Sequence, residues 1–121
     1  MAHTFKVATC AAEPASAGTP YVMYTIAGST TGVVLGLILT NIHSSAVTAE
    51  VELVSSTSNR NGANNVANGT SFLVKDVTIP AGSSLELLSG GKVVLETGDV
   101  LRVDCSVADK LSGTLSLMEI T

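Results

Sequence analysis

The stretch Val33–Ile42, which reads VVLGLILTNI, is apolar at most of its odd and most of its even positions. A β-strand with one buried face alternates apolar and polar side chains, so a strand that is apolar on both faces needs cover on both sides. The run is too short for a membrane-spanning helix, which needs about 20 apolar residues. We therefore expect a core strand whose second face is covered by another subunit.

Two rows of this strand are candidates for self-association. The odd-numbered row is Val33, Leu35, Leu37 and Leu39. The even-numbered row is Val34, Ile38 and Ile42. Because successive side chains of a strand point to opposite faces, one row should face the core and the other a partner. The sequence leaves open which row is which.

Length and composition favour one domain over residues 1–121. Hydrophobic residues make up 45% of the chain, charged residues 13% and aromatic residues 3%. This predicts an aliphatic core and a surface poor in charge. Because permanent interfaces are depleted of charged residues, the composition favours a subunit that is normally covered by a partner.

Short alternating segments separated by Gly, Pro, Ser and Asn predict a single antiparallel β-sandwich, or jelly-roll-like domain, of about eight to nine strands. The expected strands are Thr4–Cys10, Pro20–Ile26, Val33–Ile42, Val47–Leu53, Ser71–Ile79, Ser84–Leu88, Lys92–Glu96, Val100–Val107 and Gly113–Ile120. Within Val100–Val107 the alternation places Cys105 in the inner row. Cys10 and Cys105 lack the spacing of a zinc or redox pair, so we expect both to be reduced and buried.

The sequence carries no pattern of an enzyme or of a nucleic-acid-binding protein. Its formal net charge is -4 and its six cations are scattered, which argues against a phosphate backbone as ligand. His3 and His43 are the only imidazoles, and neither belongs to a metal-binding or nucleophile–base pattern. We expect no catalytic residue, cofactor or metal. The N-terminus has no basic region followed by a long apolar run, so we expect no membrane anchor.

Two further segments are candidates for contacts. Residues 55–70 form a long polar loop, whose candidate contact residues are Asn59, Arg60, Asn61, Asn64 and Asn65. Such a loop either touches a neighbouring subunit through amide hydrogen bonds or is a solvated tip that binds nothing. Residues 1–19 form a candidate N-terminal arm that docks across a subunit boundary, because Ala11–Thr19 is rich in small residues.

Several segments together carry a family resemblance. They are Tyr24–Gly28 (YTIAG), Val34–Ser45 (VLGLILTNIHSS), Ile79–Leu88 (IPAGSSLELL), Gly91–Val103 (GKVVLETGDVLRV) and Ser116–Ile120 (SLMEI). In this order they resemble small virion structural proteins of tailed bacteriophages, especially phages of marine and cyanobacterial hosts. The resemblance implies a compact β-sandwich accessory protein on the capsid or at the neck, tail or fibre attachment. The long loop at 55–70 departs from the shorter hairpin expected of such proteins.

Three functions remain open at this point. The first is a capsid decoration or cement protein of the virion, assembled in the host cytoplasm. Its partners would be its own copies, for example in a trimer, and other virion proteins such as the major capsid protein. The second is a neck, tail or fibre-attachment component. The third is a receptor- or carbohydrate-binding β module that uses the loop at 55–70.

Overall fold

The computed structural model describes residues 2–55, 69–88 and 91–121, and all regular secondary structure in these ranges is β-strand. The strands are β1 (His3–Glu13), β2 (Tyr21–Thr25), β3 (Thr31–Asn41), β4 (Val47–Val54), β5 (Thr70–Ile79), β6 (Ser84–Leu87), β7 (Val93–Leu95), β8 (Val100–Cys105) and β9 (Leu111–Ile120). Each of the nine expected strands is present, with ends that differ by at most three residues. None of the described residues forms a helix that could cross a membrane.

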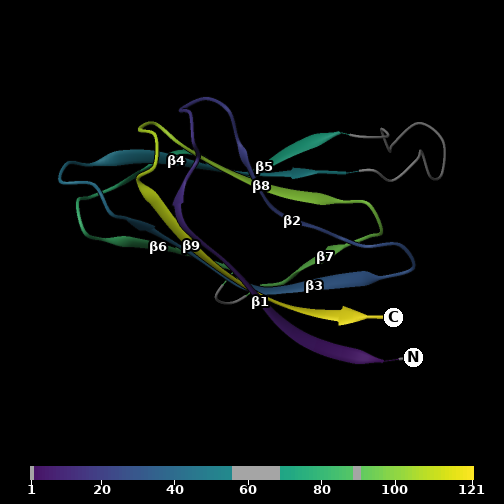
Figure 1. Ribbon diagram of the computed structural model, residues 1–121. Coiled ribbons are helices and arrows are strands. Elements are labelled where there is room, and N and C mark those ends of the chain that lie inside the picture. Colours follow the sequence, from purple (N-terminus) through teal and green to yellow (C-terminus); the bar gives the residue numbers. More distant parts are fainter. Residues whose placement is uncertain (1, 56–68, 89–90) are drawn as a thin grey trace.

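The strands form two sheets that face each other as a sandwich (Figure 1). The first sheet has the order β1-β9-β3-β6, and β7 also pairs with β3, while the second has the order β2-β8-β4-β5. β6 and β7 lie along different halves of β3, so together they occupy one strand position. The pairs β1–β9, β2–β8, β3–β6/β7 and β4–β5 are nested along the chain. This nesting is the connectivity of a jelly roll, and it confirms the predicted fold class.

The core lies between the sheets and is aliphatic. Its buried hydrophobic residues are Cys10, Met23, Ile26, Val34, Leu37, Leu39, Val47, Ala49, Val51, Ile79, Leu95, Leu101, Val103, Cys105, Leu111, Leu115 and Leu117. Both cysteines are buried and free, as expected from their phase in the strands. Burial raises the pKa of the Cys10 thiol, because a thiolate is poorly solvated among apolar side chains.

The central strand β3 changes phase part of the way along its length. Its register against β9 shifts between Val34 and Gly36, which marks a β-bulge. Before the bulge the even-numbered Val34 is buried, and after it the odd-numbered Leu37 and Leu39 are buried. The expectation that each row keeps one side along the whole strand is therefore wrong, because the extra residue at the bulge exchanges the faces.

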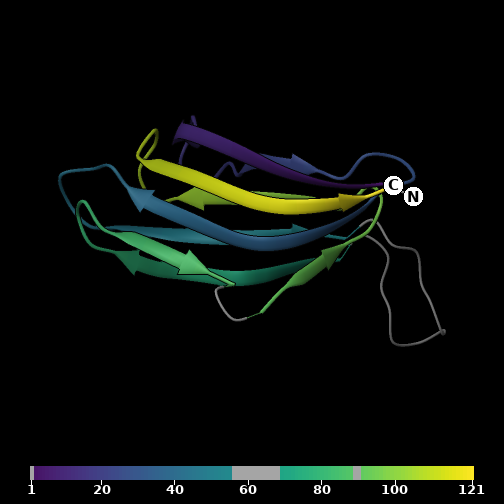
Figure 2. The same cartoon turned by 90° about the horizontal axis from the view of Figure 1, so that it is seen from below.

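The expectation that residues 1–19 form an N-terminal arm is also wrong for most of this segment. β1 is paired with β9 from His3 to Glu13, and the two ends of the chain lie side by side (Figure 2). The paired strand is more stable than a free arm because the backbone groups of β1 form their hydrogen bonds with β9. The following turn is anchored as well, since Ser16 forms a bridge with Thr19 and the Gly18 amide donates to Asp104.

Candidate assembly surface

The outer face of the first sheet carries an apolar row that crosses four strands. In register, Phe5 of β1 pairs with Met118 of β9, Met118 with Val33 of β3, and Val33 with Val94 of β7. Paired residues of a sheet share a face, so these four side chains form one line. Phe5 is 73% exposed and Val94 is 60% exposed, while Met118 and Val33 are half-buried between them. We call these four residues the apolar row.

The second sheet has a matching row of opposite character. Val22 of β2 pairs with Arg102 of β8, Arg102 with Glu52 of β4, and Glu52 with Phe72 of β5. An ion pair between Arg102 Nη2 and Glu52 Oε2 occupies its centre. We call these residues the charged row. The two rows end in the same residue types, Phe and Val, but the centre of one is apolar and that of the other is ionic.

The remainder of the first sheet's outer face is also poor in charge. The rows beside the apolar row contain His3, Ile120, Thr31, Val7, Ser116, Gly36, Thr9, Thr114, Ile38, Glu86, Ser112, Thr40 and Ser84. Among these described positions Glu86 alone carries a formal charge at neutral pH, and by strand alternation Lys92 and Glu96 flank the outward Val94 on the same face. Val7 and Ile38 are large apolar side chains that are exposed on this face. The other positions of these rows are mostly Ser, Thr and Gly, so the face is apolar along the apolar row and largely uncharged beside it. A group of exposed apolar side chains with few charges around it is typical of an interaction site.

The structure divides the interface residues expected from the sequence into two groups. Val34, Leu37 and Leu39 belong to the protein's own core and cannot touch a partner while the sandwich is closed. Val33, Leu35, Ile38 and Ile42 remain outside the core, and Ile38 and Ile42 are exposed. The expectation that either complete row forms the interface is therefore wrong.

Sequence reasoning missed the residues at the two ends of the apolar row. Phe5 and Val94 were placed in strands, but their sides were not assigned. The available signal was local: Phe5 and Val7 alternate with Thr4 and Lys6, and Val93–Val94 is apolar at two successive positions. What was missing was the register that aligns β1 with β9 and β7 with β3.

The long edge strands carry features that oppose strand-to-strand association. Lys6 of β1 lies opposite the buried Leu117, so this cation is on the inner side of an edge strand. In β5 the register against β4 is irregular near Asp76, whose φ is 51°. Inward charges and bulges are devices that keep an exposed edge from pairing with another chain. The faces of the sandwich are therefore better suited to association than these edges.

The inward Lys6 belongs to a polar cluster that joins the two sheets. Its Nζ lies 2.7 Å from Glu119 Oε1, and the Tyr24 hydroxyl of β2 donates to Glu119 Oε2 at 2.7 Å. Glu119 is largely buried. The hydrogen bond from Lys6, followed by that from Tyr24, holds the pKa of the Glu119 carboxyl below its usual value, and the bond to Glu119 raises the pKa of Lys6.

This cluster predicts a specific loss of stability in acid. A carboxylate with a lowered folded-state pKa stabilises the protein above its ordinary value of 4.5, and the contribution is lost as the pH falls through the folded-state pKa. We expect Glu119→Gln to be less stable than wild type near neutral pH, with the difference shrinking in acid. Urea unfolding from about pH 7 to about pH 3 measures it. The exposed Glu86 gives the control, Glu86→Gln, and a Glu119→Gln difference that is constant with pH would contradict the prediction.

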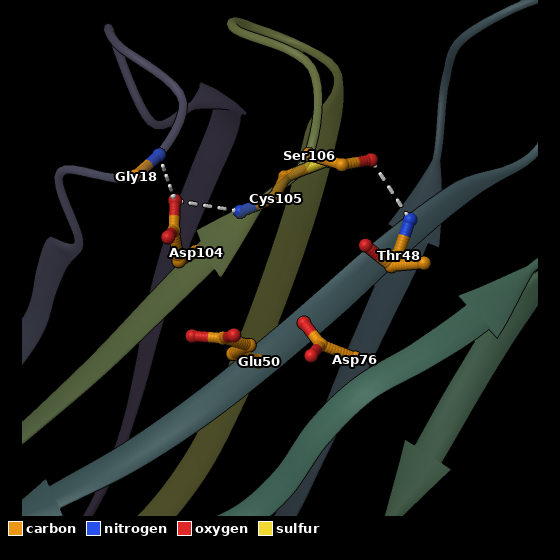
Figure 3. A pocket seen from close by; sticks show the side chains of 7 residues that line it. All are labelled: Gly18, Thr48, Glu50, Asp76, Asp104, Cys105 and Ser106. Carbon is orange, nitrogen blue, oxygen red and sulfur yellow. Dashed lines mark hydrogen bonds between the residues drawn. The ribbon is translucent and has the colours of Figure 1, made fainter.

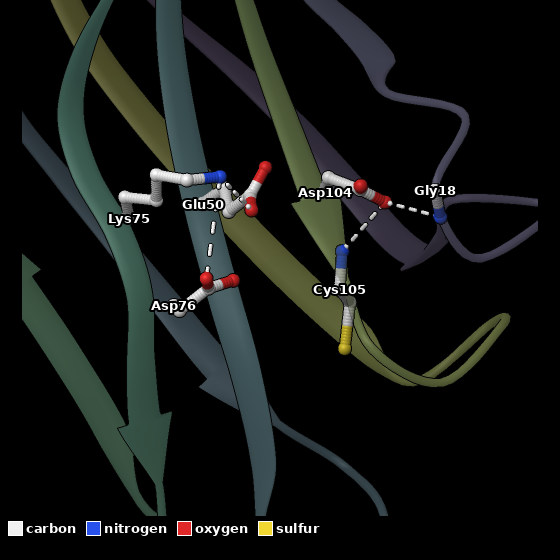
Figure 4. Close-up of polar contacts among 6 residues, drawn as sticks. All are labelled: Gly18, Glu50, Lys75, Asp76, Asp104 and Cys105. Carbon is white, nitrogen blue, oxygen red and sulfur yellow. Dashed lines mark hydrogen bonds and ion pairs between the residues drawn. The ribbon is translucent and has the colours of Figure 1, made fainter.

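A hollow of about 190 Å³ opens on the second sheet (Figure 3). Its lining residues are Gly18, Thr48, Glu50, Asp76, Asp104, Cys105 and Ser106. The acids in it already have partners (Figure 4): Asp104 Oδ1 accepts from the Gly18 and Cys105 amides, and Lys75 Nζ lies 3.0 Å from Glu50 Oε1. In the described ranges no group of three His, Cys, Asp or Glu side chains could hold a metal ion. The polar groups of the hollow therefore attach the turn at Gly18 to the second sheet.

The polar loop expected to make surface contacts lies, apart from its two ends, outside the described residues. Asn59, Arg60, Asn61, Asn64 and Asn65 lie outside the described residues. Its two ends are described: the Ser55 amide donates to the Gly69 carbonyl at 2.8 Å, which continues the β4–β5 ladder. The proposed contacts of this loop stay predictions.

Comparison with known proteins does not assign this chain to a family. No protein-family model and no curated protein matches the sequence. One solved structure, described as "Bacillus endospore appendages form a novel family of disulfide-linked pili", aligns over 99% of this chain and 87% of that chain, with 14% identity and a TM-score of 0.47. At that identity and score the likeness carries nothing about function. The protein is thus defined by its own structure as a β-sandwich with jelly-roll connectivity.

Proposed function

We propose that this protein is a non-enzymatic structural subunit of a tailed-phage virion, most specifically a capsid decoration or cement protein. The observation that carries the proposal is the apolar row and its charge-poor surroundings on the outer face of the first sheet. Exposed apolar side chains grouped on a face with few charges mark a site of interaction with another protein. The resemblance of its turns and core strands to small virion proteins is the reason for proposing a virion as the assembly to which the protein belongs.

The mechanism of such a protein is burial of apolar surface. Each Å² of apolar area removed from water contributes about 25 cal/mol, so a single subunit forms a modest contact with the major capsid protein or with a neighbouring copy. Many identical copies act together, because a subunit held at one contact reaches its second at a high effective concentration. A shell reinforced in this way resists the pressure of the packaged DNA without any chemical step.

The jelly-roll connectivity is compatible with this role but does not select it. Jelly rolls occur in viral capsid domains, in lectins and in cupins, so the fold is an argument by analogy only. A neck, tail or fibre-attachment role would use the same sandwich in a ring with a heterologous interface. The carbohydrate-binding alternative depends on the loop at 55–70, and nothing in the described residues favours it over assembly.

Quantitative mass spectrometry of purified phage particles that encode this chain tests the proposal. We expect a copy number in the hundreds, comparable with the number of capsomer subunits. A handful of copies would assign the protein to the neck, tail or fibre attachment instead. Its absence from the particle would contradict a virion role altogether.

A further inference from the structure

The two outer faces of the sandwich differ in a way that selects one of them for self-association. The centre of the apolar row is Met118 and Val33, whereas the centre of the charged row is the ion pair of Arg102 with Glu52. Covering an ion pair costs desolvation of both charges, which their mutual attraction offsets only in part. Covering Met118 and Val33 carries no such cost. The first face is therefore the one whose burial is favourable.

We propose that the outer face of the first sheet is the docking surface for a second copy of this chain. The inference rests on the proposed function, since it names the first contact by which such a subunit assembles. Sheets pack face to face at about 10 Å with aligned strands, and a twisted sheet whose outer rows carry few charges can pack against the same face of another copy. Such an interface is isologous, because the same patch is used on both subunits.

Charge favours an identical copy at this face. The chain carries a formal net charge of -4, so two copies repel each other overall. The paired rows of the first sheet's outer face carry only Glu86 among their described positions, and by strand alternation Lys92 and Glu96 flank the outward Val94. This face therefore carries two acids and one cation and repels a second copy weakly. On the second sheet Glu50 is paired with Lys75 and the nearly buried Glu52 with Arg102, so a second copy would have to cover these ion pairs with its own.

The size of the face is sufficient for a stable dimer. With a strand spacing of about 4.8 Å and a rise of about 3.3 Å per residue, a face four strands wide and about ten residues long has a flat footprint of roughly 600 Å². Its accessible area is larger, because exposed side chains such as Phe5 and Val7 stand out from the sheet. Standard interfaces bury about 800 Å² per partner. A face of this size lies at the lower end of that range, so a dimer would use the whole face.

The test is sedimentation equilibrium of the purified full chain over a wide range of concentrations. We expect the wild-type protein to self-associate. Phe5→Lys and Val94→Lys place an ammonium group at either end of the apolar row, and each should weaken the dimer by on the order of 100-fold or more. The charged row provides matched controls, Phe72→Lys and Val22→Lys, which should leave the association unchanged. Urea unfolding of each variant identifies any that fails to fold.

Two results would overturn the inference. One is a wild-type protein that is monomeric at every concentration. The other is an oligomer that Phe5→Lys and Val94→Lys weaken no more than the two controls do. Neither result touches the copy number in the particle, so the docking surface and the virion role fail separately.

Discussion

Replacing Leu37 by alanine should lower the free energy of unfolding by about 3 to 5 kcal/mol, because this fully buried side chain leaves a cavity between the sheets. Replacing Leu35 by alanine should lower it by only about 1 kcal/mol or less. The two leucines are two residues apart on the same strand, so uniform alternation would give them equal environments. The bulge between Val34 and Gly36 separates them, since Leu35 is half-buried and lies outside the core cluster.

Urea unfolding of the two variants, with circular dichroism as the probe, provides the measurement. The substitution is chemically identical at both positions, so each variant is the control for the other. Equal losses of stability would mean that Leu35 and Leu37 share one face, and that β3 keeps a single phase from end to end.

Replacing Asn41 by leucine should lower the free energy of unfolding by about 3 kcal/mol. Asn41 is fully buried at the end of β3, and its Nδ2 donates to the carbonyl oxygens of Ser45 and Ile79, each at 2.9 Å. Its Oδ1 accepts from the His43 amide at 2.7 Å. Leucine fills a similar volume but leaves these three backbone groups without their partner, so the β3–β4 turn loses its attachment to the end of β5.

Thermal unfolding with circular dichroism measures this effect. Ser45→Ala is the matched control, because the bond to Asn41 uses the backbone carbonyl of this exposed residue and not its hydroxyl. We expect Ser45→Ala to change the stability by no more than about 0.5 kcal/mol. A similarly small change for Asn41→Leu would show that the amide is not what holds the turn.

The sequence by itself determined the strands and much of the core. Alternation in Val47–Leu53 predicts that Val47, Ala49, Val51 and Leu53 share one face. The first three are buried in the core, and Leu53 is half-buried against it. The same argument placed Cys105 in the core, where it lies. These predictions succeed because a strand's two faces are encoded by its own residues, and Gly and Pro mark its ends.

Tertiary structure alone decided what lies opposite each strand. Gly36, beside Leu35, is the kind of residue that often marks a bulge, but the extra residue is defined only by the pairing of β3 with β9. Residues His3–Glu13 are a sheet edge and not an arm because β9, more than 90 residues further along the chain, supplies their hydrogen-bond partners. The buried Asn41 likewise depends on Ile79, 38 residues away.

The apolar row is the clearest case of this division. Its four members come from strands that are distant in sequence. Within its own strand, each of them is an ordinary apolar residue. The sequence correctly singled out Val33–Ile42 as a strand with two apolar sides, but it could not say that the opposite sheet covers one side and leaves the other exposed. Register across four strands turns Phe5, Met118, Val33 and Val94 into one surface, and register is a property of pairing between segments rather than of any segment alone.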